Sequence, residues 1–527
     1  MALSPDGASI VFYGAGAGGA SFGLHLRRLD RLESSPIPGG EGAANPVISP
    51  DGRAVFFIRF DGAAYQFPLD GGQPTAVADM SPVVHFAWSD DGTVVFLGAD
   101  GGIWRMPARG GSAERLASPD TASGERQLQV SDVLPGGRVA LVVASAGSGP
   151  VGPPYAVDLR SGARRRLLDT EVRGAWYVGH RTLVYTRLDG LLYGIAFDPA
   201  TLTVTGEPVG LGGPVSAMPI GLSRVSVSRT GAVLYAPVTP ADLMLVSREG
   251  GARALLERQA EYHNPRLSPD GRRIALDINE PTGRDAWVLA LDQGTLTRAT
   301  FDNDGHDAIW SRDGRSLVYA STRDGVASLL RSRLDGSPGE LLARGVTAPG
   351  GWTADGTLLG TTSGAGPATG WNLSAVAPNG AVEPFLATRF SEAWPALSPD
   401  GAWLAYVSDE SRQLEVYVRR VDGEGGRIQV STDGGTEPVW SRDGRELYYR
   451  RSSADDPEMM VARLDLTGPT VLSRHALFGW ADFEGSEPHP NYDVAPDGRG
   501  FVMIRRVQSG RLILIQNVHR LVHAGRR

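Results

Sequence analysis

The sequence contains neither cysteine nor lysine, and all 51 of its basic residues are arginine. The lack of cysteine excludes disulfides, thiolate nucleophiles and zinc sites built on cysteine. The lack of lysine excludes Schiff-base chemistry, the P-loop lysine and the phosphate-binding lysine of a protein kinase. Any chemistry of this chain must therefore use other side chains.

Excess positive charge and long apolar runs are also missing. The net charge is −8, so no bulk attraction to nucleic acid or to anionic lipid is expected. No apolar run reaches the roughly 18 residues of a membrane span. The N-terminal MALSPDGASI lacks the basic and apolar segments of a signal peptide. These absences predict no nucleic-acid binding and no membrane insertion by this chain, and they leave its compartment unknown.

Glycine and proline are abundant, with 69 and 36 copies among 527 residues. They are dispersed between short apolar runs, which is typical of many turns rather than of a low-complexity tract. Long amphipathic helical windows are hard to find. The composition favours an all-β protein.

A repeated tetrapeptide organises the whole chain. SPDG or a close variant begins at Ser4, Ser49, Ser89, Ser268, Ser311, Thr353, Ser398, Ser441 and Ala495. Degenerate copies are LPGG at Leu134, VGHR at Val178 and SRTG at Ser228. Successive copies begin 40 to 54 residues apart, which gives twelve units.

Each unit reads as four β-strands. In SPDG, proline presets φ at the second position of a type I turn, aspartate suits the third and glycine the fourth. An apolar run such as AWLAYVS follows the turn, and a short run such as EPVWS precedes it. Two further strand-like runs complete the unit, as in EVYVRRVDG and GRIQVST. Four-stranded units of this length are the blades of a β-propeller.

The turn and the strand after it resemble the TolB-like, WD40-like PD40 repeat. A second resemblance, to the propeller region that follows the kinase and membrane span in certain bacterial serine/threonine kinases, covers nearly the whole chain. It is carried by LRRLDRLESSPIPGGEGAANPVISPDGR, SPDGAWLAYVSDESRQLEVYVRRV and NYDVAPDGRGFVMIR. The resemblance implies a sensor role, and it implies an extracytoplasmic location if the chain is tethered upstream.

Twelve blades exceed the usual four to eight of one ring. We therefore expect tandem β-propellers, most simply two six-bladed TolB-like rings over 1–240 and 241–527. The last unit lacks a clear fourth strand, so we expect a segment near 241–257 to complete it. Met1 begins inside a unit, so we expect either a truncated product of a longer receptor gene or a separate reading frame derived from one.

Two apparent motifs share the stretch SIVFYGAGAGGASFG, residues 9–23. Gly14, Gly16 and Gly19 match G-x-G-x-x-G, and Ser21 stands in G-x-S-x-G. The first needs a helix after the glycines, and the second needs an α/β-hydrolase domain. The repeat register instead places a strand after the glycines, so we interpret the stretch as an inter-strand loop.

Other signs of chemistry are weak. FDNDGHD (301–307) brings Asp302, Asp304 and Asp307 together, but it lacks the glycine and glutamate spacing of a calcium loop, so we expect a polar inter-blade loop. His519 and His523 are spaced i, i+4 in an arginine-rich tail that reads as a solvated terminus. The sequence predicts no catalytic residue, no metal site and no cofactor.

A ring of channel residues is the strongest site prediction. The positions four residues before each turn in the second half should begin the innermost strands and ring the channel mouth, on the face that carries the variable loops. They are Asn264, Asp307, Pro349, Trp394, Glu437 and Asn491, flanked by His263, His306 and Glu392. Channel mouths are polar in any propeller, so the ring alone does not establish a ligand site.

Three functions remain open. The favoured one is a non-catalytic recognition module that binds a protein, a peptide or a small ligand, as the sensor part of a receptor-kinase-like system. The alternative is a channel enzyme, either a metal-dependent lactonase or hydrolase or a propeller associated with a peptidase. Its metal would need donors among Asp307, Glu392, Glu437 and His263. The third is a scaffold without a ligand.

Overall fold

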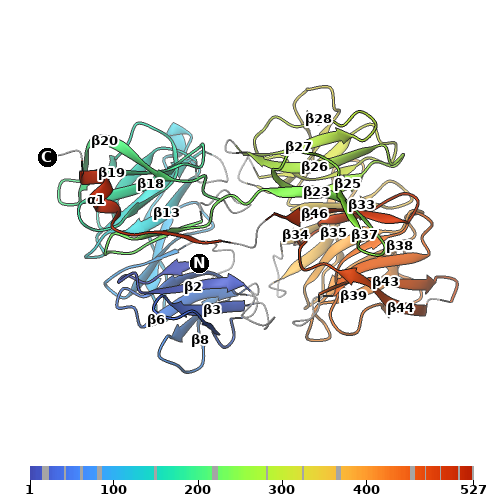
Figure 1. The fold of residues 1–527 in the computed structure, drawn as a ribbon, viewed down its shortest axis with the longest axis horizontal. Helices are drawn as coiled ribbons and strands as arrows, with labels where there is room; N and C mark the ends of the chain where they lie inside the picture. The colour runs from blue at the N-terminus through green and yellow to red at the C-terminus, as the bar shows by residue number, and fades with distance from the viewer. Residues whose placement is uncertain are drawn as a thin grey trace. The chain divides into compact units, whose positions relative to one another are not determined.

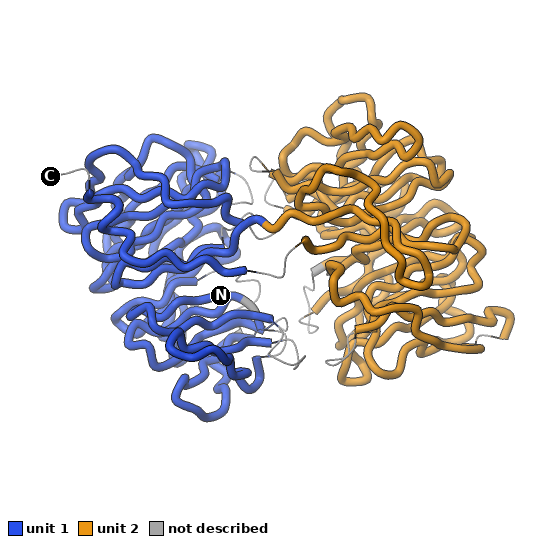
Figure 2. The backbone as a smooth tube through the Cα atoms, viewed as in Figure 1, with its two compact units in different colours: residues 1–238, 510–527 blue, residues 239–509 orange. Residues whose placement is uncertain are grey.

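The structure is a computed structural model. It describes residues 1–14, 23–40, 43–59, 63–79, 86–146, 151–216, 224–280, 283–322, 326–363, 370–451, 457–468, 470–486, 488–507 and 511–524. The chain divides into two compact units, shown in Figure 2. Unit 1 comprises Met1–Val238 and Gly510–Arg527, and unit 2 comprises Thr239–Ser509. No helix among the described residues is long and apolar enough to cross a membrane.

The described strands form eleven four-stranded sheets and one three-stranded sheet, all antiparallel. Six sheets belong to each unit, so the predicted tandem β-propeller of twelve blades is confirmed (Figure 1).

Unit 1 contains the first five blades in chain order and a sixth completed by the C-terminal strand. Its elements are β1 (Ala2–Leu3), β2 (Ser9–Gly14), β3 (Gly23–Arg28), β4 (Ser34–Pro36), β5 (Ala43–Ile48), β6 (Ala54–Arg59), β7 (Ala63–Pro68), β8 (Thr75–Asp79), β9 (Phe86–Trp88), β10 (Thr93–Leu97), β11 (Ile103–Pro107), β12 (Glu114–Ala117), the 3-10 helix η1 (Thr121–Ser123), β13 (Gln127–Val133), β14 (Val139–Ser145), β15 (Pro154–Asp158), β16 (Arg164–Arg166), β17 (Val172–Tyr177), β18 (Thr182–Arg187), β19 (Leu192–Asp198), β20 (Thr203–Gly212), β21 (Val225–Val227), β22 (Val233–Tyr235), β47 (Ile513–Ile515) and α1 (Val518–His523).

Unit 2 begins with the two outer strands of its last blade. Its elements are β23 (Ala241–Ser247), β24 (Ala252–Ala254), β25 (Glu261–Leu267), β26 (Arg273–Glu280), β27 (Gly283–Ala290), β28 (Thr295–Arg298), β29 (His306–Trp310), β30 (Leu317–Ser321), β31 (Ser328–Ser332), β32 (Glu340–Arg344), β33 (Ala348–Trp352), β34 (Leu358–Ser363), β35 (Trp371–Val376), β36 (Val382–Leu386), β37 (Glu392–Leu397), β38 (Trp403–Ser408), β39 (Glu415–Arg420), β40 (Arg427–Gln429), β41 (Thr436–Trp440), β42 (Glu446–Arg451), β43 (Glu458–Asp465), β44 (Thr470–Gly479), β45 (Tyr492–Val494) and β46 (Gly500–Arg506).

The tetrapeptide turns join the first strand of a blade to the second, as predicted. In the turn at Ser268, the Gly271 N–H donates to the Ser268 carbonyl at 2.8 Å. The Ser268 hydroxyl donates to Asp270 Oδ1 at 2.5 Å. Gly271 has a φ of 68°, a left-handed conformation that glycine adopts without strain. Local hydrogen bonding therefore explains why the repeat marks the blades.

Chain exchange closes the last blade of unit 2. Strand β23 pairs with β46 from Ala241 opposite Arg506 to Ser247 opposite Gly500, and β24 pairs with β23. Figure 1 shows green β23 beside red β46. The expectation that a segment near 241–257 completes a blade is confirmed. Leu243, Leu276 and Ile504 are fully buried together where this blade packs on the next one.

The C-terminal residues differ from the expectation. Strand β47 pairs with β22 of unit 1, and α1 contacts β18, β19 and β20. Val518 is fully buried, and the His519 ring lies 4.2 Å from that of His180. The prediction of a solvated terminus is wrong, because Val518 and Val522 supply an apolar stripe that packs on the core of unit 1. Residues 510–527 thus lie with unit 1, whereas the sequence analysis assigned them to the second half.

The glycine-rich stretch of unit 1 is flanked by two strands. Strand β2 ends at Gly14 and β3 begins at Gly23, and these two glycines pair antiparallel. Gly16, Gly19 and Ser21 lie outside the described residues. The first described element after the glycines is strand β3, at the place where a dinucleotide fingerprint requires a helix.

Candidate functional site

The innermost strands of unit 2 form a closed ring around its central channel. Each of β25, β29, β33, β37, β41 and β45 contacts the next, and β45 contacts β25. The residues that line this channel come from separate blades, so their positions depend on ring closure.

Four of the predicted ring residues occupy the same irregular position in their strands. Asn264, Asp307, Trp394 and Glu437 have φ values of 50° to 56°, and the pairing register shifts at each of them. These are β-bulges, which bend a strand and redirect its side chains. Asn264, Trp394 and Glu437 are each followed by proline, which lacks an N–H for regular pairing. The bulge lies four residues before the turn in each of these blades, so counting back from the turn finds it.

The ring residues are buried rather than exposed. Trp394 and Glu437 are 3% and 2% exposed, and Asn491 is fully buried. They lie beneath residues 484–490, which we call the cap segment; its residue 487 is outside the described residues. The Trp394 backbone N–H donates to the Pro488 carbonyl at 3.1 Å, and its indole N–H donates to the Ser486 carbonyl at 3.0 Å. The chain itself therefore covers the ring at this end of the channel.

Glu437, on the neighbouring strand β41, also holds the cap segment. Its Oε1 accepts from the Ser486 N–H at 3.1 Å, and its Oε2 accepts from the Asn491 N–H at 2.6 Å. Asn491 Oδ1 in turn accepts from the Asn264 N–H at 2.7 Å. The fully buried Arg450 lies 3.4 Å from Glu437 Oε1. Glu437 is thus committed to backbone and guanidinium donors.

A buried polar cluster connects β25, β26, β27 and β29. The Arg284 guanidinium lies 2.6 Å from Asp277 Oδ2 and 3.0 Å from Asp307 Oδ1, and it also donates to His263 Nδ1. The Asp307 N–H donates to Asp277 Oδ2 at 2.8 Å. One cation therefore serves two buried carboxylates.

The cap segment joins this cluster through His489. His489 Nε2 lies 2.9 Å from Asp307 Oδ1, and His306 Nδ1 lies 3.1 Å from Asp307 Oδ2. The Ser486 hydroxyl lies 3.1 Å from His263 Nε2 and 3.3 Å from His489 Nε2. The structure thus brings together His263, His306 and Asp307 of the predicted set, and it adds His489.

The electrostatics of the cluster follow from burial and from the guanidinium. Burial, reinforced by the Arg284 charge, lowers the pKa of His263 to about 3, so this imidazole is neutral. Burial alone would raise the pKa of Asp307, but His489 and Arg284 hold it well below its usual value. Burial also acts against the Asp277 charge, and Arg284 outweighs it and lowers the pKa of that carboxyl. Both aspartates are therefore carboxylates.

Glu392 and Pro349 stand apart from the cluster. The Glu392 carboxylate accepts from the Thr388 N–H at 3.3 Å and from the Thr388 hydroxyl, and burial raises its pKa. Pro349, on strand β33 beside β29, lines the channel cavity. Of the four metal donors expected for a channel enzyme, only Asp307 and His263 lie in this cluster, because Glu437 and Glu392 have other partners.

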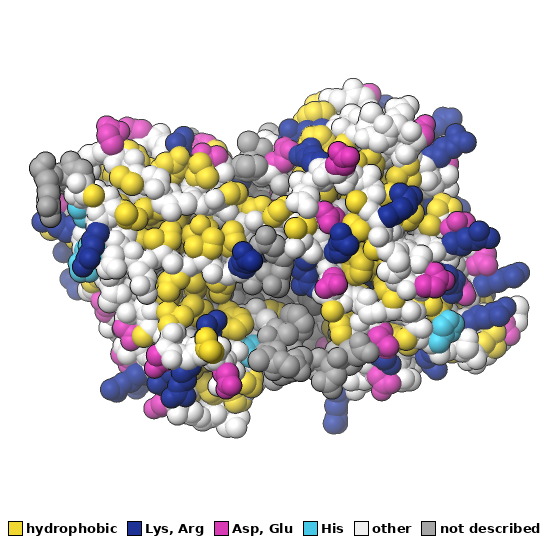
Figure 3. Space-filling model, viewed as in Figure 1, with side chains coloured by type: hydrophobic (Ala, Val, Ile, Leu, Met, Phe, Trp, Pro, Cys, Tyr) yellow, Lys and Arg dark blue, Asp and Glu magenta, His cyan; other side chains and the backbone are white. Residues whose placement is uncertain are grey.

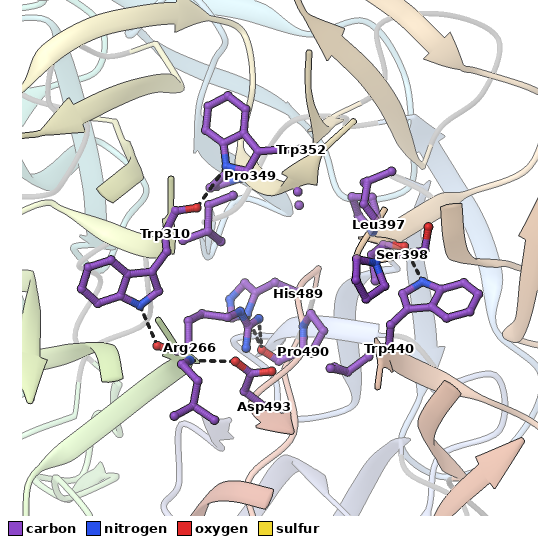
Figure 4. A pocket seen from close by; sticks show the side chains of 18 of the residues that line it. Arg266, Trp310, Pro349, Trp352, Leu397, Ser398, Trp440, His489, Pro490 and Asp493 are labelled. Carbon is purple, nitrogen blue, oxygen red and sulfur yellow. Dashed lines mark hydrogen bonds between the residues drawn. The ribbon is translucent and has the colours of Figure 1, made fainter. Parts of the chain in front are cut away.

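The channel contains a cavity of about 280 Å³ on the other side of the cap segment, seen in Figure 4. All six innermost strands line it, and His489 and Pro490 lie at its cap end. At the opposite end the cavity reaches the tetrapeptide turns, where Pro269 and Pro399 are exposed to solvent. The cavity therefore opens on the face of the turns, whereas the sequence favoured the loop face for binding.

Three tryptophans stiffen the wall of this cavity. The indole N–H of Trp310 donates to the Arg266 carbonyl at 2.9 Å, and that of Trp352 donates to the Trp310 carbonyl at 3.0 Å (Figure 4). Trp440 makes the equivalent bond to the Ala396 carbonyl at 3.0 Å. Each indole ties its blade to the preceding one, which satisfies a buried donor and fixes the wall.

The lining of the cavity carries more positive than negative charge. Arg266, Arg312 and Arg442 line it together with one carboxylate, Asp493. Asp493 Oδ2 accepts from the Leu267 N–H at 2.7 Å. The two arginines at the turns, Arg312 and Arg442, are exposed. This lining contrasts with the net charge of −8 of the whole chain.

Sequence reasoning missed these cavity residues, although a signal for them is present. Tryptophan directly precedes the turn in WSRDG at 310 and 440 and in WTADG at 352, and arginine is second in both SRDG turns. The repeat pattern was used for the fold alone. The turn sequence is nearly the same in every blade. The residue before the turn and the second residue of the turn vary, and this variation is the signal for the cavity lining.

The polar groups of the FDNDGHD loop bond to both blades that the loop joins. Asp302 Oδ2 accepts from the Tyr319 hydroxyl at 2.9 Å, and Asp304 Oδ2 accepts from the Thr322 N–H at 2.6 Å. Asp307 points instead into the buried cluster. The contacts agree with a polar inter-blade loop.

On the face of the molecule shown in Figure 3, cationic and anionic side chains are interspersed.

The chain is similar to several known proteins. It is 28% identical over 247 residues to an uncharacterized protein of Agrobacterium fabrum, a match that spans 45% of this chain and 68% of that protein. A solved structure described as TolB from Agrobacterium tumefaciens is 20% identical and covers 51% of this chain and 99% of its own, with a TM-score of 0.41. TolB from Acinetobacter baumannii is 15% identical over 62% of this chain and 79% of its own, with a TM-score of 0.37. Oligogalacturonate lyase in complex with manganese is 13% identical over 63% and 87%, with a TM-score of 0.29. No family model matches the sequence.

Proposed function

We propose that the chain is a non-catalytic recognition module that binds a protein or peptide segment, or a small ligand, in the channel of its second propeller. The observation that carries this proposal is the cavity of about 280 Å³ that leads from the turn face to the cap segment. Ligand sites are concave and largely apolar, with a few polar groups that fix orientation. Tryptophan, proline and arginine side chains supply those elements here.

The chemistry of the lining favours a ligand with an anionic group. Arg312 and Arg442 are exposed at the turns, and each donates to backbone carbonyls: Arg312 to those of Thr353 and Ala354 at 2.9 Å, and Arg442 to that of Ser268 at 3.0 Å. These bonds hold the guanidinium groups in place and leave other N–H groups for a carboxylate. Because these guanidinium groups are already held in position, less conformational entropy is lost when a ligand binds.

The predicted ring residues serve binding indirectly in this proposal. Trp394, Glu437 and Asn491 hold the cap segment, and His489 and Pro490 of that segment form the inner end of the cavity. The resemblance to kinase-linked propellers supports a sensing role. The rigidity of the ring suits a module that recognises a ligand without a moving lid.

A peptide selection tests the proposal. Random heptapeptides displayed on phage are selected against the intact chain, and enriched peptides are then measured by fluorescence anisotropy. We expect enrichment of peptides with Asp, Glu or a free C-terminal carboxylate. The variants Arg312→Gln and Arg442→Gln should each weaken binding by about tenfold, which corresponds to the loss of one charge-assisted hydrogen bond.

The matched control is Arg253→Gln, because Arg253 is exposed on β24 and lies outside the cavity lining. It should leave the affinity unchanged. Enriched peptides whose affinity survives both cavity variants would place recognition elsewhere and refute the proposal. A failure to enrich any peptide would refute recognition of a peptide segment.

A further inference from the structure

Three potential metal-ligating side chains converge where the cap segment meets the ring. They are His263 of β25, Asp307 of β29 and His489 of the cap segment, and one ligand atom from each lies within 4.8 Å of the others. His489 Nε2 is 2.9 Å and His263 Nδ1 is 3.8 Å from Asp307 Oδ1. Donor atoms around one metal with bonds of about 2.0–2.2 Å lie roughly 3–4 Å apart. The two distances to Asp307 lie in or close to this range, so small shifts of the imidazoles bring all three atoms onto one ion.

The cluster also leaves one buried carboxylate incompletely hydrogen-bonded. Asp277 and Asp307 are buried together, and Arg284 is the guanidinium that faces both. Asp277 is fully buried, and its Oδ1 has no hydrogen-bond partner among the described residues. A buried carboxylate oxygen without a donor is costly. His306 faces Asp307 through Oδ2, which leaves Oδ1 toward the other two imidazoles.

We propose that His263, Asp307 and His489 bind one divalent transition-metal ion that fastens the cap segment to strands β25 and β29. Two imidazole nitrogens and one carboxylate oxygen suit Zn²⁺ and its neighbours in the first transition row better than Ca²⁺ or Mg²⁺. His489 also lines the channel cavity, so an ion reaches the site from the turn face. The Ser486 hydroxyl lies beside His263 Nε2, the ring nitrogen that faces away from Asp307, so it orients the imidazole and is not one of the ligands.

Arg284 competes with the ion for the same oxygen. Its guanidinium lies 3.0 Å from Asp307 Oδ1 and only 2.6 Å from Asp277 Oδ2. Binding of an ion requires that Arg284 keep Asp277 and release Asp307 and His263. Removal of the guanidinium should therefore strengthen metal binding, whereas removal of a ligand should weaken it. A purely structural hydrogen-bond network gives no such opposite response.

The experiment uses the full chain without an affinity tag, freed of metal by chelator and dialysis. Co²⁺ binding is followed by its visible absorption, and Zn²⁺ is measured by its competition with Co²⁺. We expect one ion per chain and a rise in the unfolding temperature of unit 2 in the presence of Zn²⁺. His489→Gln and His263→Gln should each lower Zn²⁺ affinity at least about tenfold, and Arg284→Gln should raise it.

Two control variants separate this site from other histidines. His475→Gln changes an exposed histidine of β44, and His519→Gln changes the histidine stacked on His180 in unit 1. Both should leave the affinity unchanged. Failure to bind Co²⁺ or Zn²⁺ at one equivalent would overturn the proposal, as would binding that survives His489→Gln and His263→Gln or disappears in His519→Gln.

X-ray absorption of the zinc-loaded wild-type chain keeps the proposal falsifiable if a variant does not fold. Two imidazoles among the ligands are expected, and a sphere with one imidazole or none refutes the site. The peptide-binding proposal is independent, because it is tested by Arg312 and Arg442, which are not ligands here.

Discussion

The indole N–H of Trp394 donates a hydrogen bond of 3.0 Å to the carbonyl oxygen of Ser486, so a bulged residue of β37 carries the cap segment of the channel. The side chain is 3% exposed and packs in the core cluster of the β37–β40 blade and its neighbour. Because of this contact and its burial, substitution of Trp394 should affect the stability of unit 2.

Trp394→Ala should lower the free energy of unfolding of unit 2 by about 3–5 kcal/mol, because it removes a buried aromatic side chain and leaves a cavity. The sequence placed Trp394 only at the channel mouth, and its burial shows that substitution must also affect stability. Urea unfolding measures the change. Trp394→Phe, which keeps most of the apolar surface, should cost less than Trp394→Ala. An unchanged urea midpoint for the alanine variant would show that the cap contact is not formed.

Acid should weaken the contact of Glu446, on the β41–β44 blade, with Arg248 of the closing blade. The hydrogen bond from Arg248 at 2.9 Å, with a further one from the Tyr448 hydroxyl at 2.6 Å, holds the pKa of Glu446 below its ordinary value of 4.5 despite partial burial. A carboxyl with a lowered pKa adds stability that is complete above its unfolded-state pKa and is lost as pH falls through its folded-state pKa.

The variant Glu446→Gln isolates this contribution. At pH 7 it should be less stable than the wild type, and the difference should shrink as pH falls below about 4.5. Thermal unfolding across pH 3 to 7 measures both proteins. A difference that stays constant over this range would contradict the assignment of the pKa shift to the folded state.

Leu243→Ala should destabilise unit 2 by about 2–5 kcal/mol, since Leu243 is fully buried where the exchanged strand β23 packs against the next blade. Denaturant titration provides the measurement. Arg253→Ala on the neighbouring exposed strand β24 is the control and should stay within about 0.5 kcal/mol of the wild type. Equal effects from the two variants would mean that β23 does not close the ring.

The sequence predicted the blades well because their boundaries depend on local chemistry. The turn at Ser268 needs only its own hydroxyl, Asp270 and Gly271, so each copy can be recognised by itself. The exchange of β23 could also be foreseen, because the last unit visibly lacked a strand. The ring residues at the bulges could be predicted as well, because each lies four residues before its turn.

The cap segment and the C-terminal helix could not be predicted in this way. Residues 484–490 have no strand or helix periodicity, and their partners Trp394 and Glu437 lie about 50 to 90 residues away in sequence. The place of His489 beside Asp307 therefore depends on closure of the whole ring. Likewise, the apolar stripe of Val518 and Val522 is too short to indicate which core it covers.

Val518→Ala should lower the stability of unit 1 and leave unit 2 unchanged, because Val518 is fully buried against the core that contains Val184 and Val233. The loss should be about 1–3 kcal/mol, the usual range for removal of buried methyl groups. Hydrogen exchange reports the two units separately: amides of β18 and β22 should exchange faster, while those of β26 and β38 should keep their protection. Leu521→Ala is the matched control, since Leu521 lies on the exposed side of the same helix. Faster exchange in unit 2 with Val518→Ala would place the C-terminal residues with the second propeller after all, as the sequence had suggested.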